Sequence, residues 1–90
     1  MDQKHQKMLV NFKKAESHVA KIIKMINRNE YCIDIMQQNL AVIGLLKSAH
    51  QMLMENHLST CFSSAMESGS LAKKRKMIEE ILRVTKLSNK

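Results

Sequence analysis

The side chains with the clearest chemistry in this sequence are two cysteines and a histidine, at Cys32, His57 and Cys61. His57 and Cys61 are separated by four positions, which on an α-helix places both side chains on one face with Cβ atoms roughly 6 Å apart. One metal ion could contact both. The pair alone is a weak indication, because a cysteine on an amphipathic helix is more often a small buried apolar residue.

Cys32 adds a third soft donor, but it cannot reach the other two within one chain. It lies on what reads as the same helix as His57, and a rise of about 1.5 Å per residue separates them by roughly 37 Å. If two copies of this helix packed antiparallel and crossed midway, near Gly44 and Leu45, Cys32 of one copy would meet His57 and Cys61 of the other. Each dimer would then hold two symmetric sites.

The donor set predicts which metal such a site would bind. Two thiolates and one imidazole suit Cu(I), whereas structural Zn(II) takes a fourth ligand, so Zn(II) binding in vitro is a possible alternative. His5 could supply a fourth ligand, while His18 and His50 are expected to face solvent or to form local hydrogen bonds. The methionines of the predicted central helix are interpreted as core residues, because Met fills gaps among Leu and Ile.

The elements that must position these residues are predicted to be helices. The 90 residues include no proline and two glycines, so little interrupts long helices. The first helix should end around 27–29, the second should run from about Tyr31 to Ser63, and the third from about Leu71 to Leu87. The first helix is predicted from a stripe of apolar residues at helical spacing: Leu9, Phe12, Val19, Ile22, Ile23 and Ile26. We expect an all-α, three-helix protomer in which residues 1–90 form a single domain.

The middle of the second helix indicates that the protein is an oligomer. Residues 40–46 are apolar on every side, and a helix that is apolar all round is buried all round. A chain of this length cannot cover such a segment with one neighbouring helix, and small domains commonly need a metal or a partner subunit for stability. We therefore expect an antiparallel dimer with a four-helix core, and a pairing of two dimers into a tetramer.

Charge and composition indicate the class of partner. The formal net charge is +7, which favours a polyanion, and the three aromatic residues are too few for stacking on RNA or single strands. Duplex DNA, bound mainly through its phosphates, fits better. The polar start of the chain and the absence of a ~20-residue apolar stretch predict a cytoplasmic protein without a membrane partner. The run of cations at 73–76 opposes the dipole of the third helix, which indicates that this segment frays or meets an anion.

Two segments resemble signatures of the CsoR/RcnR family of metal-sensitive transcriptional repressors. Glu30–Ile35 is similar to its Glu-Tyr-Cys-x-Asp motif followed by Val or Ile, and Glu55–Cys61 is similar to its His-Leu-x-x-Cys motif. The spacing of Cys32, His57 and Cys61 resembles that of the copper-sensing branch. The resemblance implies a three-helix protomer, a four-helix dimer core and a tetramer. It also implies that Cu(I), as inducer, lowers affinity for operator DNA.

The resemblance extends to further residues, with some departures. It implies that Tyr31 and Glu80 couple the ligand histidine to the rest of the fold. Lys13, Lys14 and Lys47 occupy basic positions expected to contact DNA. The family's arginines in the first and second helices are replaced by Asn11 and Ile43, and a glycine of its first helix by Ser17. Because lysine does not reproduce the bidentate arginine fork, operator binding is expected to be weaker, differently specified or lost.

Two alternatives remain at this stage. A repressor of the same family could sense persulfide or another electrophile by cross-linking the two cysteines between subunits, although such a sensor has no need of His57. A copper-binding helical oligomer without regulatory DNA binding is favoured by the missing arginines. Enzymatic activity is not expected, because the sequence shows no glycine-rich phosphate loop and no nucleophile elbow.

Overall fold

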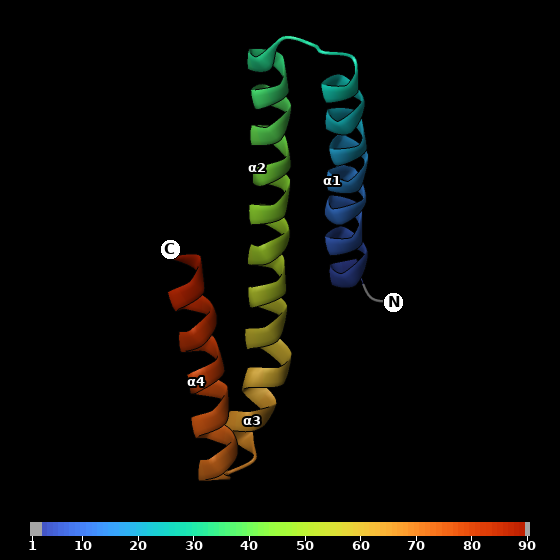
Figure 1. The fold of residues 1–90 in the computed structure, drawn as a ribbon. Coiled ribbons are helices and arrows are strands. Elements are labelled where there is room, and N and C mark those ends of the chain that lie inside the picture. Colours follow the sequence, from blue (N-terminus) through green and yellow to red (C-terminus); the bar gives the residue numbers. More distant parts are fainter. Residues whose placement is uncertain (1–2, 90) are drawn as a thin grey trace. The chain divides into compact units, whose positions relative to one another are not determined.

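The computed structural model describes residues 3–89 and shows an all-helical chain (Figure 1). Helix α1 spans Gln3–Asn27 and α2 spans Cys32–His57. A π-helical turn, η1, follows at Leu58–Phe62, then a short helix α3 at Ser63–Glu67 and helix α4 at Leu71–Ser88. No strand occurs among these residues, which confirms the all-α fold with three long helices.

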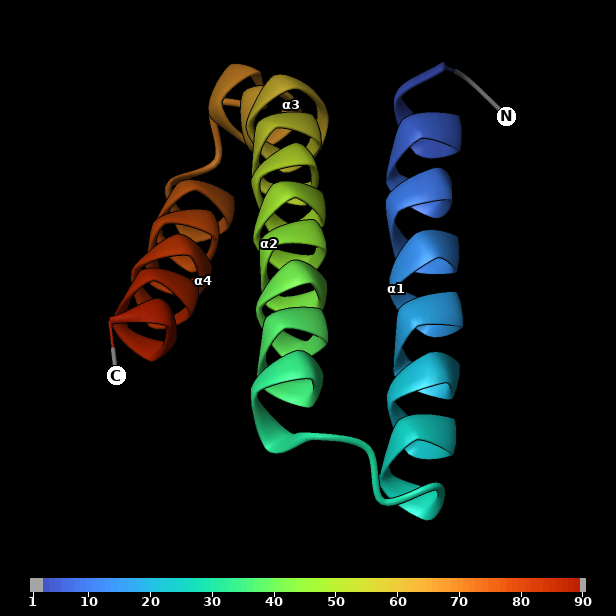
Figure 2. The same cartoon turned by 90° about the horizontal axis from the view of Figure 1, so that it is seen from above.

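The chain forms two compact units, Met1–Met54 and Glu55–Lys90. In the first unit, α1 and α2 run antiparallel and side by side (Figures 1 and 2). The buried and half-buried residues of each helix alternate at spacings of three and four, the pattern of a two-stranded coiled coil. These seam residues are Met8, Asn11, Ala15, His18, Ile22 and Met25 on α1, and Ile35, Gln38, Val42, Leu45, Ala49 and Met52 on α2.

The seam differs from the apolar stripe that the sequence marks on the first helix. Of that stripe only Ile22 belongs to the seam. The other members are 41–55% exposed: Leu9, Phe12, Val19, Ile23 and Ile26. The stripe is displaced around the helix from the seam because small and polar side chains, such as Ala15 and Asn11, occupy the positions that face α2. Helix α1 therefore carries two faces, one packed within the chain and one apolar but uncovered.

The connection between α1 and α2 is fixed by the backbone. Asn29 has a φ of 55°, in the left-handed region that asparagine tolerates. The amide of Glu30 donates to the carbonyl of Met25 at 3.0 Å, and the amide of Asn29 donates to that of Ile26 at 3.1 Å. These two bonds define a Schellman motif. The helix end predicted at 27–29 is confirmed.

The second unit contains η1, α3 and α4. Gly69 has a φ of 74°, a conformation that favours glycine, and it reverses the chain after α3. Ser70 then caps α4, because its hydroxyl accepts a hydrogen bond from the amide of Lys73 at 3.3 Å. The third helix predicted from about Leu71 is thus observed in place.

Helix α2 remains apolar on faces that α1 does not cover. Leu40 is 66% exposed, Ile43 40% and Leu46 42%. A Cβ atom added to Gly44 would meet nothing within 4 Å. Packing within the chain therefore gives no reason for a glycine in the middle of a helix, where it costs about 1 kcal/mol relative to alanine. Among residues 3–89, no helix has the length and hydropathy needed to cross a membrane.

Candidate metal centre

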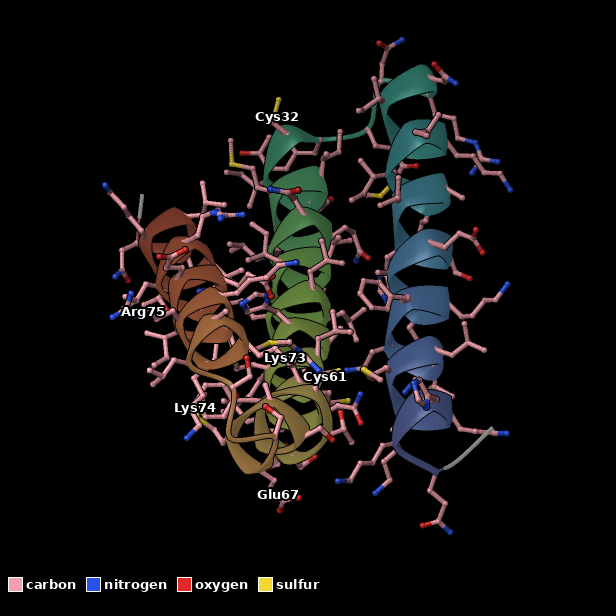
Figure 3. All side chains as sticks on the ribbon, turned by 90° about the horizontal axis from the view of Figure 1, so that it is seen from below. Cys32, Cys61, Glu67, Lys73, Lys74 and Arg75 are labelled. Carbon is pink, nitrogen blue, oxygen red and sulfur yellow. The ribbon has the colours of Figure 1, made fainter. Side chains whose placement is uncertain are left out.

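Cys32 is the first residue of α2 and carries a free, exposed thiol. The carbonyl of Tyr31 accepts hydrogen bonds from the amides of Asp34 at 3.0 Å and Ile35 at 3.2 Å, so the helix begins directly at the cysteine. Figure 3 shows the Cys32 side chain projecting from this end of the ribbon. The thiol is held on a regular helix and is open to a ligand or to another chain.

His57 and Cys61 lie where the helix changes from α to π. His57 is the last residue of α2 and is half-buried, whereas Cys61 lies within η1 and is exposed. A π turn closes its hydrogen bonds over five residues instead of four, which widens the turn and changes the angle between the two side chains. The regular α-helical stacking expected from a spacing of four is therefore replaced by a π-helical arrangement. Single π turns occur frequently at functional sites.

Hydroxyl side chains bond to the backbone around this turn. The Thr60 hydroxyl donates to the carbonyl of Asn56 at 2.6 Å, and the Ser63 hydroxyl donates to that of Leu58 at 2.9 Å. Such bonds compete with the α-helical ladder and so favour a local departure from it. The Thr60 oxygen also lies 3.7 Å from the Cys61 sulfur. Because the hydroxyl has one hydrogen and the carbonyl is much closer, the Cys61 sulfur keeps its lone pairs available.

The structure does not bring the three predicted ligands together in one chain. Cys32 and His57 are the first and last residues of α2, so the helix itself separates them. Within residues 3–89, no three histidine, cysteine, aspartate or glutamate side chains are grouped so that they could hold a metal ion. The ligand set therefore stays a prediction that needs a second chain.

The other histidines have different surroundings. The Nδ1 atom of His18 lies 3.3 Å from Oε1 of Gln38, so this half-buried ring forms a hydrogen bond across the α1–α2 seam. His50 is exposed on α2. His5 lies in the first turns of α1, also exposed.

Tyr31 and Glu80, predicted to couple the ligand histidine to the fold, occupy contrasting environments. The Tyr31 ring is 68% exposed at the start of α2. Glu80 is half-buried on α4. Among the described residues of the second unit, Glu80 forms no hydrogen bond with His57. The coupling stays a prediction.

The predicted DNA-contacting lysines are exposed, as a phosphate contact requires. Lys13 and Lys14 line a shallow pocket of about 440 Å³ on α1 with Leu9, Val10, Ser17 and His18. Lys47 is exposed on α2. Asn11, which stands where the resembling family has an arginine, is half-buried in the α1–α2 seam, while Ile43 is 40% exposed.

Comparison with known proteins identifies the class. Residues 4–86 match the family described as metal-sensitive transcriptional repressor. The chain is 39% identical over 66 residues to the copper-sensing transcriptional repressor CsoR of Mycobacterium ulcerans, covering 73% of this chain and 56% of that protein. It is 35% identical over 57 residues to CsoR of Bacillus subtilis, covering 63% of this chain and 56% of that protein. It is 32% identical over 75 residues to the copper-sensing transcriptional repressor RicR of Mycobacterium tuberculosis, covering 83% of this chain and 78% of that protein.

The all-helical fold and the match over residues 4–86 define the class as metal-sensitive transcriptional repressors. The chain belongs to the metal-sensitive transcriptional repressor family. The aligned part spans little more than half the length of the CsoR proteins it matches.

Proposed function

We propose that this chain is a Cu(I)-responsive transcriptional repressor that binds duplex operator DNA as a metal-free homo-oligomer and releases it when metal binds. The observation that carries the proposal is the placement of two free, exposed thiols at opposite ends of the helix and turn that also hold His57. The proposal is also supported by the similarity of the chain to CsoR and RicR, which are copper-sensing transcriptional repressors.

In the proposed site, Cys32 of one subunit joins His57 and Cys61 of another. Two thiolates and an imidazole are soft to intermediate donors and fit Cu(I); Zn(II) could bind in vitro if a fourth ligand is supplied. Bound copper would supply a bridge that ties the two chains together. Cys32 and Cys61 contribute exposed sulfurs, and His57 contributes a half-buried imidazole ring. Helix α2 is a regular α-helix up to His57.

The proposed oligomer is an antiparallel dimer with a four-helix core, paired into a tetramer. The support is apolar surface left uncovered in the first unit, both on the α1 stripe of Leu9, Phe12, Val19, Ile23 and Ile26 and on α2 around Leu40. Exposed apolar surface of this extent is typical of an interaction site. A crossing at Gly44 would give the glycine the close helix approach that the single chain does not use.

Release of DNA requires that metal and operator favour different arrangements of the helices. Such reciprocal coupling is typically about 1–3 kcal/mol. In the proposal, Tyr31 and Glu80 transmit the state of the ligand histidine, and Lys13, Lys14 and Lys47 contact DNA phosphates. The chain acts in the cytoplasm, and its activity is regulatory rather than enzymatic.

The test is a titration of Cu(I) against affinity for DNA upstream of the protein's own gene, under anaerobic conditions. We expect copper to weaken the DNA affinity of the wild type and to leave the DNA affinity of the Cys32→Ala variant unchanged. Metal analysis of both proteins with Cu(I), Zn(II) and Ni(II) offered in turn identifies the preferred ion. Equal DNA affinity with and without copper would reject derepression. If a persulfide releases the protein from DNA and copper does not, the alternative of a redox-sensing repressor is favoured. If the protein binds no DNA with or without copper, the alternative of a copper-binding oligomer without regulatory DNA binding is favoured.

A further inference from the structure

A second feature of the Cys61 region is a pocket of about 410 Å³ that lies entirely within the second unit. Residues of η1, α3 and α4 line it: Cys61, Ser64, Ala65, Ser68, Lys73, Lys76 and Met77. The volume falls in the range of roughly 300–1,000 Å³ typical of small-molecule sites. The Cys61 thiol is therefore not only a surface group but part of the wall of a pocket.

The charge of this pocket is one-sided. Lys73 and Lys76 are three positions apart on α4 and so share a face, and no acidic residue is among the lining residues. Within residues 3–89 neither lysine forms an ion pair. The first turn of an 18-residue helix adds positive potential in the same place. Within the described residues, the ammonium groups of Lys73 and Lys76 are therefore not engaged in an ion pair.

Side-chain direction distinguishes these lysines from the rest of the basic run at 73–76. Figure 3 shows Lys73 beside Cys61, whereas Arg75 projects away from it on the far side of α4. Lys74 and Arg75 do not line the pocket. The other walls are partly apolar, formed by Ala65 and Met77, with Ser64 and Ser68 as hydroxyl groups. An organic anion with an aliphatic body suits this lining better than inorganic phosphate does.

We propose that this pocket binds a small anionic thiol, with its carboxylates held by Lys73 and Lys76 and its sulfur beside Cys61. Thiolates are preferred ligands of Cu(I), so such a molecule can carry copper to the site. In the transfer, one copper–sulfur bond to the carrier breaks as one to Cys61 forms. The Cys61 thiol proton passes to the carrier's sulfur, and copper remains Cu(I). This delivery role rests on the function proposed above; the binding of the anion does not.

The binding test uses reduced, metal-free protein and glutathione as the probe, with backbone and side-chain NMR shifts as the readout. We expect saturable binding that moves the signals of residues lining the pocket. S-methylglutathione, which keeps the carboxylates but lacks the free thiol, should bind with similar affinity. The double variant Lys73→Gln/Lys76→Gln should weaken binding about fivefold, the size expected from losing two exposed ion pairs.

The matched control is Lys74→Gln/Arg75→Gln, which removes the same charge from the same turn outside the pocket. It should change the dissociation constant by no more than about twofold, the effect of diffuse charge alone. Equal weakening by both variants, absence of saturable binding, or displacement by inorganic phosphate at equal concentration would overturn the proposal. Circular dichroism spectra matching wild type show that both variants are folded.

The delivery role is tested by the rate of copper transfer from two donors. Transfer from the Cu(I)–glutathione complex should slow about fivefold in Lys73→Gln/Lys76→Gln, in line with the weaker ion pairing. Transfer from Cu(I) in acetonitrile, a neutral carrier, should be unchanged. An equal slowing from both donors would contradict delivery through the pocket. If glutathione binds as expected but the protein takes up no copper, the proposed function fails while the anion site stands.

Discussion

His18 and Gln38 are joined by a hydrogen bond of 3.3 Å between Nδ1 and Oε1 across the α1–α2 seam. The two residues stand at positions of the seam that coiled coils usually fill with apolar side chains. A polar pair at such a position specifies register at some cost in stability. The pair therefore fixes how α1 and α2 align.

The first prediction follows from this pair. His18→Ala should lower the free energy of unfolding by about 1 kcal/mol, because Gln38 is left without its partner. His18→Leu/Gln38→Leu should be close to neutral or stabilising, since both polar groups leave the seam together. Urea denaturation of the wild type, of the single variants His18→Leu and Gln38→Leu and of the double variant, all at one fixed protein concentration, measures the full double-mutant cycle. Additive losses from the two single variants would show that the bond contributes nothing.

The second prediction concerns the proposed intersubunit ligand set. Cys32→Ala and Cys61→Ala should each abolish high-affinity copper binding when purified alone. A mixed dimer of the two variants contains one complete site, because the first chain supplies His57 and Cys61 and the second supplies Cys32. After unfolding and refolding an equimolar mixture, random pairing should restore about one quarter of the wild-type sites. Quantitative Cu(I) titration measures this fraction.

The control for that experiment is a mixture of Cys32→Ala with the double variant Cys32→Ala/Cys61→Ala. No pairing of these chains contains a Cys32 thiol, so copper binding should stay absent. If copper binding by the Cys32→Ala and Cys61→Ala mixture is no greater than by either variant alone, the ligands do not come from different subunits.

The helix boundaries could be predicted from the sequence because their signals are local. Asn29 and Gly69 adopt the left-handed conformations that end helices, and Ser70 is a favoured capping residue. The intrachain seam was not predictable in the same way. Its α1 face includes Ala15, Asn11 and His18, whereas the more apolar stripe of Leu9 and its neighbours drew attention to a face that the chain leaves exposed.

The candidate ligands could be selected from residue type and spacing, but their local geometry could not. The π turn at Leu58–Phe62 and a regular α-helix differ little in free energy. The balance between them depends on several weak hydrogen bonds from hydroxyl groups to the backbone, such as those of Thr60 and Ser63. The serine and threonine content around Cys61 was the available signal. The pocket beside Cys61 could not be predicted from the sequence, because its lysines lie more than ten positions further along the chain. They come near Cys61 only through the packing of α3 against α4.

The third prediction tests the role of Gly44. In an isolated chain Gly44→Ala should stabilise α2 by about 1 kcal/mol, because the added Cβ meets nothing and alanine is the better helix former. At a close helix crossing between subunits the same methyl group should instead weaken the oligomer, and Gly44→Leu should weaken it further. Sedimentation velocity over a range of concentrations measures the shift. Unchanged assembly of Gly44→Leu would place the crossing elsewhere.

The fourth prediction concerns the DNA-contacting lysines. Lys13→Gln/Lys14→Gln should weaken binding to duplex DNA nearly uniformly across sequences and should reduce the salt dependence of log affinity by about one per lost phosphate contact. Lys21→Gln/Lys24→Gln removes the same charge from exposed positions further along α1 and serves as the control. Fluorescence anisotropy at several salt concentrations gives both slopes. Because released counterions report phosphate contacts rather than net charge, a slope that falls equally in the two variants would mean that Lys21 and Lys24 contact phosphates as much as Lys13 and Lys14 do, and that the DNA contact is not specific to Lys13 and Lys14. A slope that falls in the first variant alone would place the phosphate backbone against this part of α1.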